Sequence, residues 1–363
     1  MVVVGGGVIG LSCAWRLAQR GAEVAVLEKG LPGAGATRVA AGMLAPVGEL
    51  TFGEPELLEL TLAAARMYPE FVAELEDATG QSTGYERLGA LHVALDRDEA
   101  VQLRRVHDLQ LSLDLEAEWL STRQCRELEP GLAPSFHGGV LAAGEAAIDP
   151  RRLTEVLLAA CEDEEIDVRT GTEVVEGIFE GERLVGVKGR SDVQTTFDRP
   201  LDIRARTVVL ASGAWSGQTD WLPPEARPPI RPVKGQVVEL RSRDGEPPTR
   251  HILASERVYL VPRADGRLVV GATVEEMGFD TTVTAGGVHE LLREAYRLLP
   301  DVAEMELVDA TAGLRPGTPD NLPLVGPGAI DGLVLATGHF RNGILLAPLA
   351  AETVAEQLSG VLR

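Results

Sequence analysis

Three glycines near the start of the chain have the spacing that a phosphate-binding turn requires. Gly5, Gly7 and Gly10 form the pattern GxGxxG, directly after an apolar run and directly before an amphipathic helical pattern. The first glycine permits a tight turn, the second lets the backbone approach a pyrophosphate, and the third allows close packing of helix on strand. The pattern therefore predicts a diphosphate at the positive end of the helix.

An acidic residue stands where a dinucleotide site needs one. Glu28 ends the second apolar strand, close to the spacing of about 20 residues that is typical of this site. A carboxylate there can accept hydrogen bonds from the hydroxyls of the adenosine ribose. The competing interpretation is a glycine-rich turn followed by an incidental surface glutamate. The strand, turn, helix and strand in this order favour the dinucleotide site.

The elements that must position these residues begin with a strand, helix, strand unit. Residues 2–4 form a first strand that is short, so the sequence leaves open whether its start is complete. A helical pattern follows from Leu11 to Gly21, and a second strand covers residues 24–27. This order is the format of a parallel sheet.

The rest of the chain alternates between helical and extended patterns, punctuated by glycine and proline. The expected helices cover residues 55–80, 99–109 and, with Asp149 as N-cap, 149–164. Strands are expected at 90–95, near Val168 and Val174, at 184–187 and at 207–210. Turns are expected at 189–200 and 223–232, and antiparallel strands within 237–272, where Asp265 and Gly266 mark a turn.

Two later segments distinguish between FAD and NAD as the dinucleotide. Residues 206–217 (RTVVLASGAWSG) form an apolar strand that ends in small residues, similar to the second dinucleotide contact of two-domain flavoproteins. Residues 331–348 (DGLVLATGHFRNGILLAP) form a strand, a glycine turn and a helix that starts near Asn342 or Gly343. The N-terminus of that helix could direct its dipole at the flavin N1 and C2 carbonyl. A simple NAD dehydrogenase has no need of this pair, so the sequence favours FAD.

Composition excludes several classes of partner. With 34 Lys and Arg against 55 Asp and Glu, the formal charge is −21, which would repel nucleic acid. No apolar run approaches the ~18 residues of a membrane span. Nothing at the start resembles a secretory signal, so we expect a cytoplasmic location. No HxxH or Asp/His cluster in the sequence supports a metal site.

The cysteines are too few and too far apart for a disulfide framework or a zinc site. Cys13, Cys125 and Cys161 show no CxxC spacing, so we expect ordinary buried thiols. None of them follows residue 161, which leaves no cysteine near the C-terminal flavin segment to tether the ring. We therefore expect FAD to be held without a covalent bond.

The motifs together resemble the D-amino-acid-oxidase-like superfamily of FAD-dependent oxidoreductases, and within it the glycine oxidases of the thiamine pathway. The resemblance runs from end to end in the same order. It is carried by the two later segments and by VVVGGGVIG (2–10), AAGML (40–44), VYLVPR (258–263) and AGLRPGTPDNLPLVG (312–326).

The resemblance implies a set of FAD contacts along the chain beyond the glycine turn. They are Val8, Ile9, Glu28, Lys29, Ala36, Thr37, Ala41, Gly42, Met43, Val174, Gly213, Gly338, His339, Phe340, Arg341, Asn342, Gly343, Ile344 and Leu345. We expect His339 to act through its backbone rather than its imidazole. Arg38 departs from a stretch that should be small and polar, which puts the packing over the pyrophosphate in question.

The same resemblance implies that Arg315, Arg341 and Tyr259 contact substrate and carry the catalysis, and that Met43 walls the pocket. A guanidinium can meet a carboxylate through two parallel hydrogen bonds, which suits Arg315 as a clamp. Tyr259 would donate its hydroxyl to the same carboxylate, and Arg341 would add a second positive charge. The plainer alternatives are surface arginines, a core tyrosine and a core methionine.

The expected reaction is oxidation of glycine or a related small amine. The α-hydrogen passes as hydride to flavin N5 once the amine is neutral, so placement matters more than a strong base. Oxygen then gives hydrogen peroxide, and the imine product would serve thiazole assembly in thiamine synthesis. The alternatives are a sarcosine or D-amino-acid oxidase or dehydrogenase, and a flavin-binding subunit of a larger complex. We also expect a homo-oligomer.

The length of 363 residues suits two packed domains. The expected fold class is α/β: a Rossmann-type FAD-binding domain with a parallel sheet, and an inserted α+β substrate domain with a mostly antiparallel sheet. The FAD-binding domain would be discontinuous, with residues 1–85, 149–220 and 311–363. The substrate domain would comprise residues 86–148 and 221–310.

Overall fold

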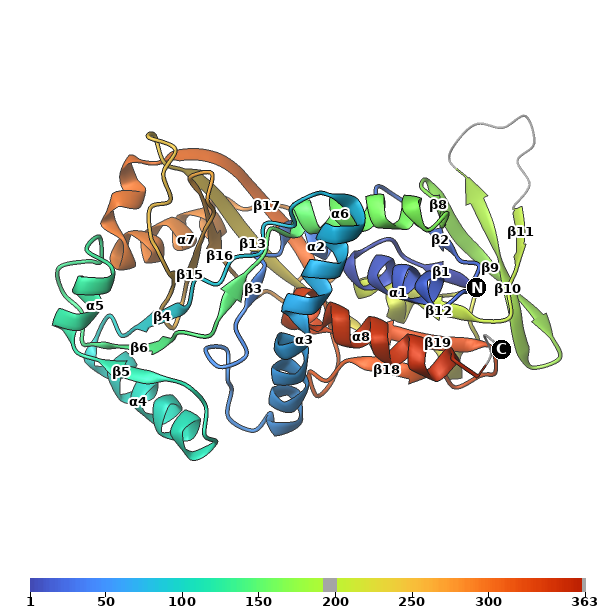
Figure 1. Cartoon of the computed structure of the whole chain (residues 1–363), viewed down its shortest axis with the longest axis horizontal. Coiled ribbons are helices and arrows are strands. Elements are labelled where there is room, and N and C mark those ends of the chain that lie inside the picture. Colours follow the sequence, from blue (N-terminus) through green and yellow to red (C-terminus); the bar gives the residue numbers. More distant parts are fainter. Residues whose placement is uncertain (192–200, 361–363) are drawn as a thin grey trace.

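The computed structural model describes residues 1–191 and 201–360, so the expected turn at 189–200 lies outside the described residues from position 192 onward. Two sheets of different kinds dominate the molecule (Figure 1). A parallel sheet with flanking helices lies next to both termini, and a larger, mostly antiparallel sheet forms the other half. The expected α/β fold class is confirmed.

The first sheet has six strands in the order β18-β19-β12-β1-β2-β8, and only β18 is antiparallel to its neighbour. The strands are β1 (Val2–Val4), β2 (Ala25–Leu27), β8 (Asp167–Arg169), β12 (Val208–Leu210), β18 (Leu324–Pro327) and β19 (Leu333–Thr337). The short β1 lies in the middle, paired with β2 and β12. Its three valines are buried, and pairing on both sides stabilises this strand although it is short.

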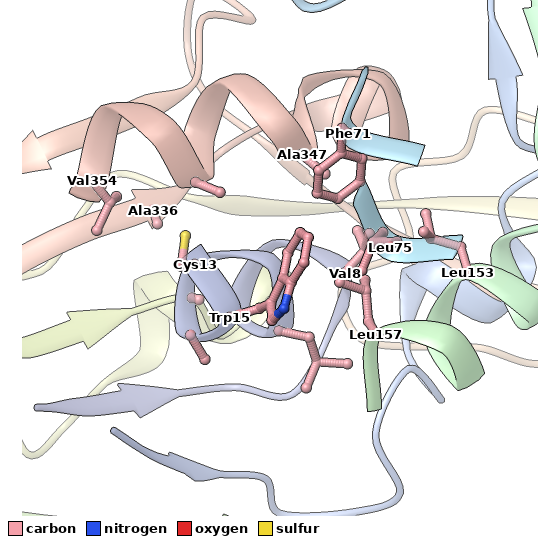
Figure 2. Close-up of a cluster of buried hydrophobic side chains, with 14 of the residues drawn as sticks. Val8, Cys13, Trp15, Phe71, Leu75, Leu153, Leu157, Ala336, Ala347 and Val354 are labelled. Carbon is pink, nitrogen blue, oxygen red and sulfur yellow. The ribbon is translucent and has the colours of Figure 1, made fainter. Parts of the chain in front are cut away.

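Helices cover this sheet and enclose its core. They are α1 (Val8–Gln19), α3 (Pro55–Thr79), α6 (Pro150–Asp163) and α8 (Gly343–Leu358). Trp15 of α1 is almost fully buried and meets Phe71 of α3 edge to face, with ring centroids 5.9 Å apart. Figure 2 shows both rings among apolar side chains of α6 and α8. Because aromatic side chains bury 150–250 Å² each, this contact fixes α1 against α3.

Short elements and a small antiparallel sheet complete this half. The short elements are α2 (Ala36–Val39), β3 (Met43–Leu44), β7 (Ala146–Ala147), η1 (Gly213–Gln218) and η4 (Phe340–Asn342). The small sheet comprises β9 (Thr172–Glu180), β10 (Arg183–Ser191) and β11 (Leu201–Arg204). The strands expected near Val174 and at 184–187 are β9 and β10, both longer than predicted.

The second large sheet has eight strands in the order β17-β13-β16-β15-β14-β4-β6-β5. Neighbouring strands in this sheet are antiparallel, except for β14 and β4, which are parallel. The strands are β4 (Ala90–Val93), β5 (Glu118–Leu120), β6 (Gly139–Ala142), β13 (Arg231–Arg241), β14 (Ile252–Ala254), β15 (Tyr259–Pro262), β16 (Arg267–Gly271) and β17 (Glu306–Gly317). The expected turn at Asp265 and Gly266 joins β15 to β16.

Alternation along these strands separates two faces. One face carries large apolar residues, such as Val238 and Leu240 of β13, and packs with residues of α5 (Thr122–Leu128) and α7 (Ala285–Leu298). The 3-10 helix η3 (Pro300–Glu304) packs in this half, whereas η2 (Pro224–Ala226) packs with β1, β2 and β12 of the parallel sheet. The other face, which includes Gly235 and Val237, borders the central cavity. The cavity therefore lies on the side of this sheet that is turned toward the parallel half.

The helix expected at 99–109 is longer in the structure. It is α4 (Arg97–Ser112), and it starts earlier because Asp96 accepts hydrogen bonds from the backbone N–H groups of Asp98 and Glu99. An aspartate at the N-cap satisfies amides that have no partner within the helix. The expected cap of α6 is confirmed in the same way, because Asp149 accepts from the amides of Arg151 and Arg152.

The two halves meet at several points along the chain. β17 pairs with β13 from Glu306 to Gly317, so it spans the domain boundary expected at residue 311. Asp149, at the start of α6, forms an ion pair with Arg267 of β16. We retain the division into an FAD-binding domain and a substrate domain as a proposal.

Candidate functional site

A cavity of about 1370 Å³ lies between the two large sheets. The carboxyl ends of β1, β2, β12 and β19 open onto it through Gly5, Glu28, Ser212 and His339 respectively. Ligands of open α/β sheets bind at this edge of the strands. Tyr259 and Arg315 of the antiparallel sheet line the same cavity. The structure thus brings together residues more than 300 positions apart.

The glycine turn has the geometry that its sequence predicts. Gly5 has φ of 110°, and a Cβ on it would lie 2.5 Å from the carbonyl oxygen of Ala211. A Cβ on Gly10 would lie 1.9 Å from the carbonyl oxygen of Gly5, so α1 packs against the turn only because position 10 is glycine. Gly7 and Val8 line the cavity at the N-terminus of α1. This cradle fits a diphosphate group.

Glu28 is held in place by two backbone amides. Its Oε2 accepts from the N–H of Gly6 and its Oε1 from the N–H of Gly30, each at 2.7 Å. The carboxylate is half-buried and lines the cavity. It therefore stabilises the glycine turn directly, and its remaining lone pairs are available to ribose hydroxyls.

The segment from Ala36 to Met43 forms one wall of the cavity. Thr37 is buried, and its Oγ1 accepts from the N–H of Val8 at the start of α1. Arg38, which departs from the expected small, polar pattern, is exposed to solvent. Its side chain therefore leaves the space over the turn free. Lys29 and Val174 also line the cavity, and Lys29 pairs with Glu173 at 2.7 Å.

The C-terminal segment supplies a second helix N-terminus. Gly343 and Ile344 at the start of α8 line the cavity, together with His339, Phe340 and Arg341. Tyr68 of α3 donates to the carbonyl of Ile344 at 3.1 Å and so anchors this end of α8. The amides of a helix start favour negative charge, which suits a reduced flavin ring.

The imidazole of His339 is buried, and burial lowers its pKa to about 4. The ring is therefore neutral near neutral pH. The backbone carbonyl of His339 accepts from the N–H of Asn342 at 2.9 Å.

Arg315 and Tyr259 stand over two glycines of the antiparallel sheet. A Cβ on Gly235 would lie 2.3 Å from Nη1 of Arg315, and a Cβ on Gly271 would lie 2.4 Å from the Tyr259 hydroxyl. Nη1 of Arg315 also donates to the carbonyls of Lys234 and Thr273, at 3.3 and 3.2 Å. Burial raises the pKa of the Tyr259 hydroxyl, and the Arg315 guanidinium opposes that rise. The two groups form a fixed donor pair.

Arg341 lines the cavity, but its guanidinium also binds the loop of residues 45–54. Its Nη2 donates to Thr51 Oγ1 at 2.8 Å, to the carbonyl of Glu49 at 3.3 Å and to Glu54 Oε2 at 3.4 Å. In the structure, Arg341 therefore connects η4 to this loop through hydrogen bonds. Its contact with substrate remains a prediction.

Sequence reasoning missed several residues of the site. Glu49 lines the cavity in the 45–54 loop; burial raises the pKa of its carboxyl, and Arg341 and Arg315 oppose the rise. Gly235 and Gly271 make room for Arg315 and Tyr259. Short sequence patterns do not signal any of the three. The register of β13 with β17 and of β15 with β16 could have found the two glycines.

Four predicted contacts lie behind the wall of the cavity rather than on it. They are Gly10, Gly338, Asn342 and Leu345. Leu345 is part of the apolar core, and Asn342 is buried at the start of α8. Their roles at FAD remain predictions, as do those of the predicted contacts that do line the cavity.

Among the residues that the structure describes, metal-binding groups and membrane-spanning helices are absent. Within residues 1–191 and 201–360, no group of three or more His, Cys, Asp or Glu is placed to hold a metal ion. In the same part of the chain, no helix combines the length and the apolar character needed to span a membrane. Cys13, Cys125 and Cys161 are free and buried, and none of them lines the cavity.

The fold and the cavity define a dinucleotide-binding protein. Comparison with known proteins gives the family. The model of the FAD dependent oxidoreductase family matches residues 1–357. The chain therefore belongs to this family, and its cofactor is FAD, which the glycine cradle, Glu28 and the size of the cavity fit.

The relatives share most of the chain. A glycine oxidase of Pseudomonas aeruginosa is 35% identical over 99% of this chain and 94% of its own. A bifunctional protein ThiO/ThiG of Trichormus variabilis is 36% identical over 98% of this chain, and the chain spans about half the length of that protein (52%). The crystal structure of glycine oxidase from Geobacillus kaustophilus matches with a TM-score of 0.88 and 33% identity, over 98% of this chain and 93% of that one.

Proposed function

We propose that the protein oxidises the amine of glycine and related small amino acids. The observation that carries the proposal is the donor pair of Arg315 and Tyr259, which faces the cavity beside the N-terminus of α8. A planar guanidinium next to a phenol is suited to one carboxylate. Similarity to the glycine oxidases supports glycine as the substrate.

The side chains of this site bind and orient rather than react. Arg315 is held by two carbonyl groups, so its free donors meet the substrate carboxylate without reorganisation. Tyr259 has a pKa raised by burial, so it remains a hydroxyl donor. FAD, held by the glycine turn and Glu28, would supply the acceptor for the α-hydrogen of the neutral amine and the route of the two electrons to oxygen, with hydrogen peroxide as the product. The substrate becomes an imine, and water releases ammonia from it.

The substrate must lose its ammonium proton before the hydride can leave. Arg315, Tyr259 and Arg341 offer no base for this proton. If it leaves to solvent, the rate of flavin reduction in anaerobic stopped flow rises with pH, with an apparent pKa that follows the substrate amine. If Glu49 accepts it, the apparent pKa stays fixed when sarcosine replaces glycine.

We further propose that the imine product serves thiazole assembly in thiamine synthesis. Similarity to the ThiO/ThiG proteins supports this role. Oxygen as the acceptor, a homo-oligomeric state and a cytoplasmic location belong to the same proposal.

Two other functions have specific support. A crystal structure of an iminodiacetate oxidase from Chelativorans sp. matches with a TM-score of 0.87 and 26% identity, which favours N-substituted amino acids such as sarcosine. A hydrogen cyanide synthase subunit HcnC of Pseudomonas aeruginosa is 30% identical over 96% of this chain, which favours a flavin-binding subunit.

One assay separates these functions. The purified, FAD-loaded chain is tested for peroxide and ammonia release with glycine, sarcosine, iminodiacetate and D-alanine, and again with a quinone as acceptor. The proposal expects the highest kcat/KM for glycine with oxygen. A higher kcat/KM for another amine would identify that amine as the substrate. A preference for quinone over oxygen would identify the enzyme as a dehydrogenase. Lack of turnover by the isolated chain with any of them would favour the subunit.

A further inference from the structure

The 45–54 loop connects β3 to α3 and borders the cavity through Gly48, Glu49, Leu50 and Thr51 (Figure 1). Distant segments hold it in place. Arg341 binds its second half, as described above. Gln110 of α4, which is buried, donates through Nε2 to the carbonyl of Val47 at 2.9 Å. These contacts give the loop one position over the cavity.

The third anchor of the loop is a buried carboxyl group. Glu145 lies in the turn between β6 and β7 and is only 2% exposed. Its Oε1 accepts from the N–H of Val47 at 2.9 Å and from the N–H of Gly48 at 2.5 Å. One oxygen therefore satisfies two successive amides, which fixes the direction in which the next residue, Glu49, leaves the turn.

The other oxygen of Glu145 faces a complementary atom. Oε2 of Glu145 and Nε2 of His92 are both buried, and neither has a hydrogen-bond partner among the described residues. Both atoms lie close to Gly48. A Cβ on Gly48 would lie 3.0 Å from Oε2 of Glu145 and 2.2 Å from Nε2 of His92. A glycine at position 48 thus leaves a small polar space between them.

The ionisation of the two groups suits this arrangement. Burial raises the pKa of Glu145 to about 8 and lowers the pKa of His92 to about 4. Near neutral pH the carboxyl is then mainly protonated and the imidazole neutral. A protonated Oε2 can donate, and an imidazole nitrogen without a proton can accept. The two groups are then uncharged, and they can form a hydrogen bond to each other directly or through one water.

We propose that Glu145 is a positioning residue for the site: it fixes the turn at Val47 and Gly48 and thereby sets Glu49 at the cavity, with His92 as the partner of its second oxygen. Glu49 in turn faces Arg315 and Arg341. Withdrawal of Glu145 lets Glu49 move relative to the donor pair of Arg315 and Tyr259. The part of this inference that concerns substrate rests on the proposed function; the part that concerns the loop does not.

The protein contains a matched control for a buried carboxylate. Glu129 is 3% exposed, and its Oε1 also accepts from two successive amides, those of Arg250 and His251. It does not line the cavity, and its bonds do not involve the 45–54 loop. Loss of Glu129 should therefore reproduce the structural cost of losing Glu145 without its effect on the site.

The experiment compares Glu145→Gln, Glu145→Leu and Glu129→Leu as FAD-loaded proteins. Hydrogen exchange of the peptide containing Val47 and Gly48 is measured together with KM and kcat for glycine. For Glu145→Leu we expect exchange and KM each to rise about tenfold or more, with the flavin spectrum retained. Glu145→Gln keeps an acceptor oxygen and should restore both values. Glu129→Leu should melt at a lower temperature with KM and exchange at this peptide unchanged.

Two results would overturn the proposal. One is wild-type exchange and KM in Glu145→Leu; the other is an equal rise of KM in Glu129→Leu. If Glu145→Leu does not fold, Glu145→Asp decides, because the shorter side chain withdraws the carboxyl from both amides and should raise exchange and KM. If the wild-type chain does not oxidise glycine, the proposed function fails, whereas hydrogen exchange still tests the role of Glu145 in the loop.

Discussion

Two glycines determine how the donor pair stands in the cavity. Gly235 of β13 and Gly271 of β16 lie directly beneath the guanidinium of Arg315 and the ring of Tyr259. A side chain at either position would occupy the space of the donor that lies above it. The geometry of the clamp therefore depends on two residues that have no functional groups.

Replacement of Gly235 by alanine tests this dependence. Its Cβ would lie 2.3 Å from Nη1 of Arg315, so the guanidinium must move. We expect KM for glycine to rise about tenfold, equivalent to about 1.4 kcal/mol, while FAD remains bound. Glycolate titration of the flavin absorbance gives the affinity directly. Gly286→Ala in α7, where a Cβ meets no atom within 4 Å, is the control. An unchanged glycolate affinity in Gly235→Ala would show that the substrate carboxylate does not bind at Arg315.

The pH dependence of stability should report on Glu145. Burial raises the pKa of this carboxyl to about 8, Glu49 adds to the rise, and the amides of Gly48 and Val47 oppose it. A glutamate in an unfolded chain has a pKa of about 4.3. The folded protein therefore prefers the protonated form, and the stability from this group, complete below about pH 4, is lost as pH rises through about 8.

Glu145→Gln removes this titration. We expect the melting temperature of the variant relative to wild type to increase from about pH 5 to about pH 8 and then to level off. Thermal unfolding followed by circular dichroism measures the difference. His92 faces the same space and has a pKa of about 4, so it stays neutral over this range. A difference that is constant with pH would show that Glu145 is ionised throughout.

At the scale of elements, the start of α1 and the end of β2 form one unit. Glu28 binds the amides of Gly6 and Gly30, and Thr37 binds the amide of Val8, so side chains from the second strand and from α2 hold the turn between β1 and α1. The cradle for the diphosphate is therefore rigid only when these contacts are made.

Glu28→Ala should weaken FAD binding. Loss of the carboxylate leaves two amides without their acceptor and removes the candidate partner of the ribose, a cost of about 1–3 kcal/mol. Fluorescence titration of the apoprotein with FAD measures the change in Kd, which we expect to be about tenfold or more. Glu182→Ala, in the exposed turn between β9 and β10, serves as control. Equal FAD affinity in both variants would contradict the role of Glu28.

At the scale of the whole molecule, the site exists only where the two halves meet. Asp149 caps α6 in the parallel half and pairs with Arg267 of the antiparallel sheet, with Oδ2 2.5 Å from Nη2. Both side chains are largely buried. Burial acts to raise the pKa of Asp149, but its hydrogen bond and ion pair with Arg267 outweigh this and lower it. This contact therefore joins the two halves and loses strength only in acid.

Asp149→Asn separates the two roles of this residue. The amide oxygen can still cap α6, whereas the ion pair with Arg267 is lost, and this largely buried guanidinium keeps only Asp265 and Glu239 as ion-pair partners. Removal of one member of a buried pair costs about 3–5 kcal/mol when the other charge is left alone. Because Asp265 and Glu239 still pair with Arg267, we expect a smaller but measurable fall in the denaturant midpoint at neutral pH. The gap from wild type should narrow as pH falls through the pKa of Asp149. Asp96→Asn, which changes an exposed cap of α4, should cost far less; equal losses would exclude a special role for Arg267.

The sequence alone determined the features that depend on neighbours along the chain. The turn at Gly5, Gly7 and Gly10, the acidic end of β2 at Glu28, the cap of α6 at Asp149 and the start of α8 at Gly343 follow from residue spacing and local backbone preferences. A resemblance in motifs indicated the family, and the match along residues 1–357 confirmed it.

The tertiary structure decided the features that depend on contacts between distant segments. Glu145 and His92 stand on separate elements with no spacing pattern, and only their approach to Gly48, the neighbour of Glu49, reveals them. The space under Arg315 and Tyr259 depends on strand register, and the binding of Arg341 to the 45–54 loop depends on how η4 packs. Burial changes pKa values through the surrounding low-dielectric protein, which no local pattern encodes. Sequence therefore predicted the cofactor site, and packing arranged the groups around the proposed substrate position.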